Sequence, residues 1–195
     1  AEQEDIYKTT AKNYPNDYRA YNNLAQLAFQ KGDLSATKSY LDQAARLKAD
    51  APEVNANYAL VALAEGNVEK AESYLAKASA AKNYNEILGN LQIAKGNYAQ
   101  AAQSLSGVNT NSAALAQILN KDYTSASATL SKVANADAMT SYLKAIVAAR
   151  TNQSSAVVSN LRDAISKDAS LKDRAAKDLE FAALFDDASF QSLVK

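Results

Sequence analysis

The sequence lacks the residues on which several kinds of protein chemistry depend. Its 195 residues include no cysteine and no histidine. A disulfide framework, a thiolate nucleophile and a zinc site built from imidazole or sulfur ligands are therefore excluded. Catalytic triads that require histidine or cysteine are excluded for the same reason.

Residues that break helices are also scarce. Only two prolines and five glycines occur, so long irregular loops are not expected, and no run of alternating β-branched residues predicts a strand. No stretch of about 18 consecutive apolar residues is present, so no membrane-spanning helix is predicted. The first five residues, AEQED, are acidic and do not have the pattern of a signal peptide. The composition therefore predicts an α-helical protein.

Charge of one sign is not concentrated anywhere in the sequence. The 21 basic and 21 acidic residues balance to a formal charge of zero, and they are interspersed, as in Lys167-Asp168. Nucleic-acid binding needs a concentrated positive field that releases counterions from phosphate. We therefore expect neither nucleic acid nor an anionic membrane surface as a partner.

What the sequence does contain is a repeat. Leu24-Ala25 is followed by Gly32-Asp33, and 34 residues later Tyr58-Ala59 is followed by Gly66-Asn67. A third copy comes at nearly the same step, with Leu88-Gly89 followed by Gly96-Asn97. Small residues let two helices approach closely, and large neighbours fill the space beside them. The glycine can adopt φ > 0 and end the first helix, and Asp33 or Asn67 suits the start of the second.

This pattern resembles the tetratricopeptide repeat (TPR) family, whose period is also 34 residues. The resemblance implies an all-α fold, a right-handed α-α superhelix or TPR-like solenoid of antiparallel helix pairs with a C-terminal helical cap. The first helix of each pair, helix A, is expected over 18–30, 52–65 and 82–95. The second, helix B, is expected over 34–48, 68–81 and 98–106.

The predicted organisation is a single solenoid over residues 1–195. Its parts are a half repeat at 1–17, TPR-like repeats at 18–51, 52–81 and 82–107, degenerate pairs at 108–135 and 136–168, and a cap at 169–195. Residues 1–14 look like a lone helix B, so we expect the chain to be a piece of a longer protein or to begin after a processed region. In the cap, Asp186 or Asp187 should start a short final helix, and apolar residues should cover the last open face, namely Phe181, Leu184, Phe185, Phe190 and Leu193.

The TPR resemblance also implies a binding face, because helix A in that family lines a concave groove that holds an extended peptide. The residues carried over to this face are Arg19, Asn22, Asn23, Gln26, Gln30, Glu53, Asn57, Leu60, Asn83, Glu86 and Asn90. A side-chain amide both donates and accepts, so it can pair with the backbone of a peptide whatever its sequence. The alternative, that these asparagines simply belong to the packing pattern, stays open. TPR domains that clamp a C-terminal carboxylate use Lys and Arg. Only Asn57 fits that pattern here, and such a clamp is not expected.

These observations predict a protein–protein interaction scaffold that is not an enzyme and needs no cofactor and no metal. Its partner should be a protein or a peptide, and the oligomeric state is not predicted. A second interpretation is a structural spacer or assembly module of a larger bacterial cell-envelope protein. A third, an enzyme, would need a deep pocket with two converging ionisable groups. An exported or envelope-associated location is favoured over the cytoplasm, because it suits a protein without cysteine.

Overall fold

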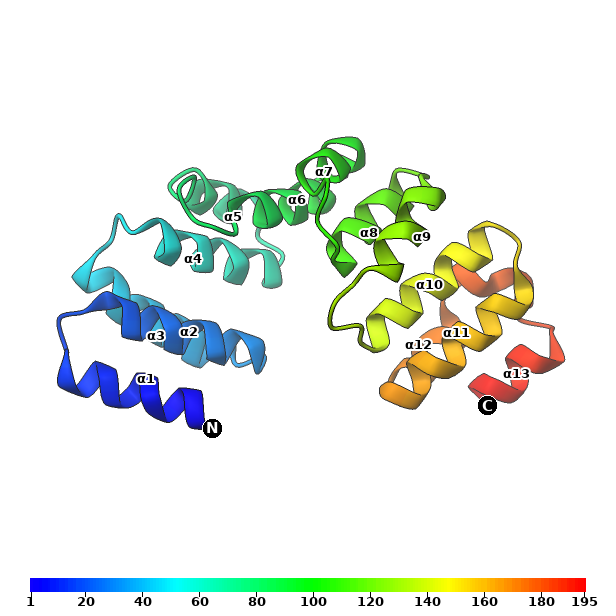
Figure 1. Ribbon diagram of the computed structural model, residues 1–195, viewed down its shortest axis with the longest axis horizontal. Coiled ribbons are helices and arrows are strands. Elements are labelled where there is room, and N and C mark those ends of the chain that lie inside the picture. The colour runs from blue at the N-terminus through cyan, green and yellow to red at the C-terminus, as the bar shows by residue number, and fades with distance from the viewer. The chain divides into compact units, whose positions relative to one another are not determined.

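The computed structural model describes residues 1–195 and contains helices as its only regular secondary structure (Figure 1). The helices of the N-terminal half are α1 (Glu2–Asn13), α2 (Tyr18–Gln30), α3 (Leu34–Leu47), α4 (Pro52–Ala64), α5 (Val68–Leu75) and α6 (Tyr84–Ala94). Those of the C-terminal half are α7 (Tyr98–Ser104), α8 (Asn111–Leu119), α9 (Tyr123–Ser131), α10 (Ala138–Arg150), α11 (Ser154–Lys167), α12 (Leu171–Lys177), the 3-10 helix η1 (Leu179–Leu184) and α13 (Ala188–Val194). The fold is an all-α, TPR-like array of helix pairs, as the repeat predicts.

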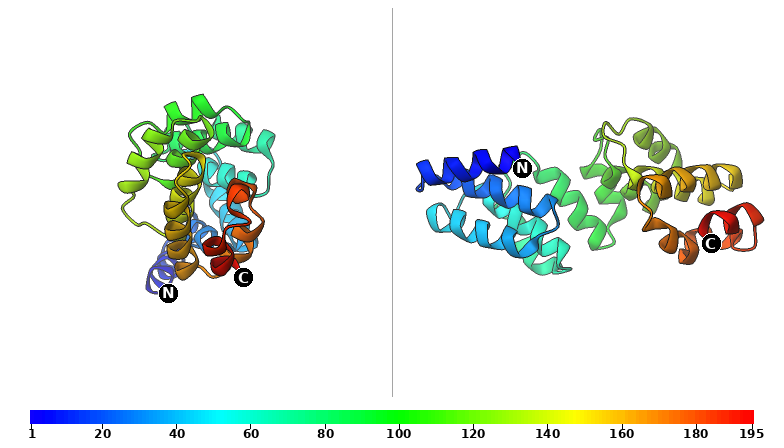
Figure 2. Two further views of the ribbon diagram at one scale, coloured as in Figure 1. Left: turned by 90° about the vertical axis from the view of Figure 1, so that its right-hand side faces the viewer. Right: turned by 90° about the horizontal axis from the view of Figure 1, so that it is seen from below.

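The chain forms two compact units, residues 1–97 and residues 98–195. In the first unit, α2 pairs with α3 and α4 with α5, while α1 packs on α2, and α6 packs on both α4 and α5 (Figures 1 and 2). In the second unit, α8 pairs with α9 and α10 with α11, and α7 packs on α8. Each unit is therefore a stack of helical hairpins.

The repeat residues occupy the positions that the sequence predicts. Ala25 and Ala59 are fully buried, and Leu24 is 3% exposed. The large residues of the next two copies, Tyr58 and Leu88, are half-buried at the edges of the apolar clusters of the first unit. The small residues thus allow the helices of a pair to cross closely, which is the packing that the pattern predicts.

The turns that follow α2, α4 and α6 share one backbone conformation. The glycines at these turns, Gly32, Gly66 and Gly96, have φ of 76°, 74° and 78°. Asp33 and Asn67 then accept hydrogen bonds from the first turns of α3 and α5, at 2.9 and 3.0 Å. The same left-handed backbone recurs at Lys121 (φ 63°) in the second unit, where the sequence has no glycine.

One predicted helix is wrong in its extent. Helix B of the second pair was expected over 68–81, but α5 ends at Leu75, and residues 76–83 form a series of tight turns. The run of alanine and lysine in this segment favours a helix locally. In the structure, Ala78 is fully buried and Ala81 is 7% exposed, both in the cluster that includes Leu91 of α6. Tertiary packing therefore overrides local helix propensity here.

The C-terminal segment closes the second unit. Phe181 and Phe190 are almost fully buried and lie near each other, with ring centroids 6.2 Å apart. Leu184, Phe185 and Leu193 pack against the same cluster. Asp187, one of the two expected capping residues, accepts a hydrogen bond from the backbone N–H of Phe190 at 3.0 Å and begins α13. The prediction of a helical cap is confirmed.

Candidate partner-binding groove

A groove of about 610 Å³ lies in the first unit, between the N-terminal parts of α2 and α4 and the segment that precedes α6. Residues from four parts of the sequence line it: Tyr18, Arg19, Asn22, Asn23 and Gln26 from α2, Glu53 and Asn57 from α4, Ala80, Ala81 and Lys82 from the turns after α5, and Asn83 at the start of α6. The volume lies within the range typical of pockets that hold ligands.

The floor of the groove contains a pair of buried amides. Asn57 Nδ2 donates a hydrogen bond to Asn22 Oδ1 at 2.8 Å, and the two residues are 5% and 6% exposed. This bond leaves the Nδ2 of Asn22 and the Oδ1 of Asn57 without a partner in the protein. Because no fully buried side-chain nitrogen or oxygen lacks a partner, neither atom is fully buried, and both residues line the groove. The pair thus retains one donor group and one acceptor group that no protein group uses.

The charges around the groove offset one another. Arg19 is held by Asp17, with Nη2 2.6 Å and Nε 2.9 Å from the carboxylate oxygens. The guanidinium, together with the backbone N–H of Arg19, lowers the pKa of Asp17 to about 2. The remaining charged residues are one acid and one base, Glu53 and Lys82. The groove therefore has no excess of one sign, which fits an uncharged ligand better than a terminal carboxylate.

An open aromatic shelf adjoins the groove and shares Tyr18 and Arg19 with it. The shelf is a depression of about 690 Å³ formed mainly by the turn between α1 and α2. Tyr14 is 66% exposed there, and the Lys48 ammonium lies 5.4 Å from the centre of the Tyr18 ring. The shelf extends the accessible surface beyond the start of α2.

The structure brings together seven of the eleven residues expected to bind a partner. These seven are Arg19, Asn22, Asn23, Gln26, Glu53, Asn57 and Asn83. The other four do not line the groove: Gln30 and Glu86 are exposed elsewhere on their helices, Leu60 packs against an apolar cluster and Asn90 is half-buried in α6. Of the two asparagines of α2 in this set, Asn22 rather than Asn23 forms the hydrogen bond to Asn57.

Sequence reasoning missed the contribution of residues 80–82. A helix through residue 81 would have carried these side chains on helix B, away from helix A. Because α5 ends early, the backbone turns back and places Ala80, Ala81 and Lys82 at the rim of the groove. No local signal marks this turn, since the segment 76–82 contains no glycine or proline.

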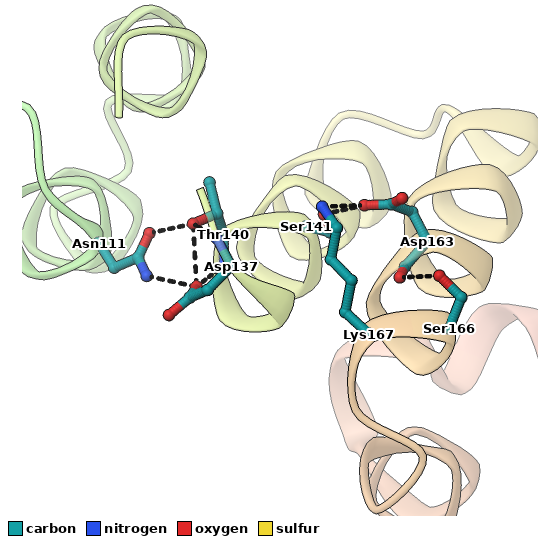
Figure 3. Close-up of polar contacts among 7 residues, drawn as sticks. All are labelled: Asn111, Asp137, Thr140, Ser141, Asp163, Ser166 and Lys167. Atoms are coloured by element: carbon teal, nitrogen blue, oxygen red, sulfur yellow. Dashed lines mark hydrogen bonds and ion pairs between the residues drawn. The ribbon is translucent and has the colours of Figure 1, made fainter. Parts of the chain in front are cut away.

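The second unit uses its polar side chains differently (Figure 3). Asn111, the first residue of α8, donates to Asp137 at 3.0 Å and accepts from Thr140 at 2.9 Å, while Asp137 caps α10. Aligning the ends of α4 and α10 places Leu143, which is 4% exposed, at the position equivalent to Asn57. The side-chain amide of Asn111 therefore holds α8 and α10 together, and the second unit has no amide pair equivalent to Asn22–Asn57.

A serine, an aspartate and a lysine also meet in the second unit. Ser141 of α10 donates a short hydrogen bond to Asp163 of α11, and Lys167 forms an ion pair with the same carboxylate at 2.9 Å (Figure 3). These two contacts lower the pKa of Asp163. The lysine contacts the aspartate rather than the serine, so it is not placed to take the serine proton. The cluster ties α10 to α11.

Comparisons with known proteins concern the fold. No protein-family model matches the chain, and no curated protein sequence matches it. Among solved structures, the chain is similar to PilW, described as a widely conserved type IV pilus biogenesis factor, with a TM-score of 0.60. The match has 18% sequence identity and covers 91% of this chain and 87% of PilW. At this identity the likeness shows the fold alone. None of the helices is both long enough and apolar enough to cross a membrane.

Proposed function

We propose that the protein is a non-catalytic interaction scaffold, and that the groove of its first unit holds an extended segment of a partner protein. The Asn22–Asn57 pair carries this proposal, because its free donor and free acceptor are complementary to the C=O and N–H of one residue of an extended peptide, which point to the same side of the strand. Such hydrogen bonds recognise the backbone of the peptide rather than its side chains. The neighbouring amides of Asn23 and Gln26 provide further donors and acceptors along α2.

The balance of charge in the groove supports the same proposal. With Arg19 held by Asp17, Lys82 is the one cation of the groove that forms no ion pair, whereas a clamp for a C-terminal carboxylate uses several cations. We therefore expect the affinity for the partner segment to change little with salt, because few counterions are released on binding.

The experiment begins with peptides selected on the full-length protein from a random library, measured by calorimetry. Asn23→Ala with Gln26→Ala should weaken binding roughly 10- to 100-fold, since each lost hydrogen bond contributes about 0.5–1.5 kcal/mol. Gln30→Ala is the matched control, because Gln30 lies on the same helix outside the groove. Equal affinities for the groove variant and the control would contradict the proposal.

A second candidate function is a structural or assembly module associated with the bacterial cell envelope. Its support is the fold shared with PilW, a type IV pilus biogenesis factor. In that role, a folded partner would cover the outer helices α3 and α5 rather than the groove. Hydrogen exchange measured with a purified partner distinguishes the two, because protection would fall on α3 and α5 in one case and on α2 and α4 in the other.

A further inference from the structure

The first unit contains a ladder of three ion pairs at equivalent positions of successive repeats. Each pair joins the residue that ends a helix A, just before the left-handed glycine, to the preceding helix B. The pairs are Glu4–Lys31 at 2.5 Å, Lys38–Glu65, and Glu72–Lys95 at 2.7 Å. Residues 4, 38 and 72 are spaced by 34, and residues 31, 65 and 95 are the C-caps of α2, α4 and α6.

The sign of the charges alternates along this ladder. The helix B position is acidic in α1, basic in α3 and acidic in α5, and the C-cap position has the opposite sign each time. Each hairpin consequently carries two charges of the same sign. The α2–α3 hairpin has Lys31 and Lys38, and the α4–α5 hairpin has Glu65 and Glu72.

Because the signs alternate, each hairpin attracts its native neighbour and repels a hairpin that is shifted by one repeat. If the α2–α3 hairpin stacked directly on α6, Lys38 would face Lys95, and if α1 stacked on the α4–α5 hairpin, Glu4 would face Glu65. A hairpin that stacked on its own counterpart in a second copy of the protein would also meet like charges. All three native rungs, in contrast, are attractive.

We propose that the alternating ladder sets the order in which the hairpins of the first unit stack, and that it disfavours stacking of a hairpin on a non-neighbouring or identical hairpin, whether in the same chain or in a second copy of the protein. Stacked repeats are open to such errors, because their apolar faces resemble one another. Each rung is solvent-exposed, with side chains 28–57% accessible, so its direct contribution to stability is small. Its effect lies in the difference between the correct pairing and the incorrect ones.

The second unit provides an internal comparison. The C-cap positions of α8 and α10 hold uncharged residues, Asn120 and Thr151. There, α10 is joined to η1 by a contact that does not repeat, the bidentate pair of Arg150 with Glu180 at 2.5 and 2.9 Å. A contact that occurs once can form only between its own two helices, so the second unit does not need alternating charges. The first unit repeats more regularly and has the ladder.

The ladder can be tested in the full-length protein with two substitutions that preserve every native attraction. Lys38→Glu with Glu65→Lys gives all three rungs the same signs, with an acidic residue in helix B and a basic residue at the C-cap. Incorrect stacks then become attractive as well. Lys38→Glu alone should lower the urea midpoint of unfolding, and adding Glu65→Lys should recover most of that loss. The double variant, refolded at high concentration and low salt, should yield at least about threefold more mis-stacked dimer than the natural protein by chromatography with light scattering.

A fully inverted ladder is the matched control, with all six signs reversed and Lys8→Glu added to keep the second contact of Glu4. It alternates, so it should refold to monomer like the natural protein. At about 1 M salt the Debye length is about 3 Å, so the repulsion between like charges of the ladder is largely screened. The natural protein should then form as much dimer as the double variant. Equal dimer yields for the natural protein and the double variant at low salt would overturn the proposal, as would an inverted ladder that dimerises as readily as the double variant.

Discussion

Replacing Lys121 by glycine should stabilise the second unit, because Lys121 occupies a backbone conformation that suits glycine. Its φ is 63°, at the turn position that Gly32, Gly66 and Gly96 fill in the first unit. The left-handed region costs a residue with a Cβ about 1–2 kcal/mol. Glycine recovers this in the folded state but gives back about 0.4–1 kcal/mol through the greater freedom of the unfolded state. We expect a net gain of about 0.5–1 kcal/mol.

The converse substitution isolates the same effect in the first unit. A Cβ added at Gly66 would meet no atom within 4 Å, so Gly66→Ala has no steric cost beyond the backbone conformation. It should destabilise that unit by about 1 kcal/mol. Asn152, at φ 58° in the next turn, should respond less to glycine than Lys121 does, since asparagine tolerates this region better.

The assay is urea unfolding followed by circular dichroism, fitted for two units if two transitions are visible. With a slope of about 1.5 kcal/mol per M, the midpoint of the affected transition should move by about 0.5 M, upward for Lys121→Gly and downward for Gly66→Ala. The side chain of Lys121 is exposed and makes no ion pair in the structure, so lost contacts would not mask the gain. A Gly66→Ala protein with an unchanged midpoint would refute the reasoning.

Two further predictions concern buried and charged groups. Tyr142→Phe should cost the second unit about 1–2 kcal/mol in urea unfolding, because the fully buried tyrosine donates a 2.6 Å hydrogen bond to Asp178 that phenylalanine cannot make; unchanged stability would show that water replaces the bond. The first unit should lose stability as pH falls from about 4.5 toward 2, since Lys31 and Lys8 lower the pKa of Glu4 to about 2 and Arg19 does the same for Asp17. A carboxylate with a lowered pKa stabilises the fold above its unfolded pKa and loses that contribution as it is protonated in the folded state. Glu4→Gln should flatten the acid dependence of the midpoint, and a profile identical to that of the natural protein would exclude Glu4 as its source.

The fold was accessible from the sequence because its determinants are local and periodic. A glycine at the end of helix A, an Asp or Asn one residue later and a small residue one period apart each report on a conformation within a few residues. Lys121 shows how far the pattern extends: the position keeps the left-handed backbone although the glycine is gone. Helix propensity, in contrast, predicted the wrong end for α5, because packing of Ala78 and Ala81 decides that segment.

The candidate site was only partly accessible, since its geometry depends on how different helices meet. The TPR resemblance placed Asn22 and Asn57 on helix A, but no period indicates that they bond to each other, because 35 residues separate them rather than 34. The alternating ladder could have been found by comparing charges at positions 4, 38 and 72. Without the structure, nothing indicates that these side chains reach residues 31, 65 and 95.

The Asn22–Asn57 pair offers a way to separate folding from binding. Asn57→Leu alone leaves the Oδ1 of Asn22 unpaired at 6% exposure, so it should cost about 1–3 kcal/mol. Replacing both amides by leucine removes the unpaired atom, and the second unit already places Leu143 at the position of Asn57. The double variant should therefore unfold within about 1 kcal/mol of the natural protein in urea.

The same double variant should no longer bind a groove peptide, because two apolar groups cannot pair with the C=O and N–H of a peptide backbone. If its stability loss equals the sum of the two single losses, the amides stabilise the stack and their main role is packing. If it is stable and still binds with unchanged affinity, the peptide is held by other groups. Only a stable protein that has lost binding supports an amide pair retained for recognition, since leucine would otherwise satisfy the fold at both positions.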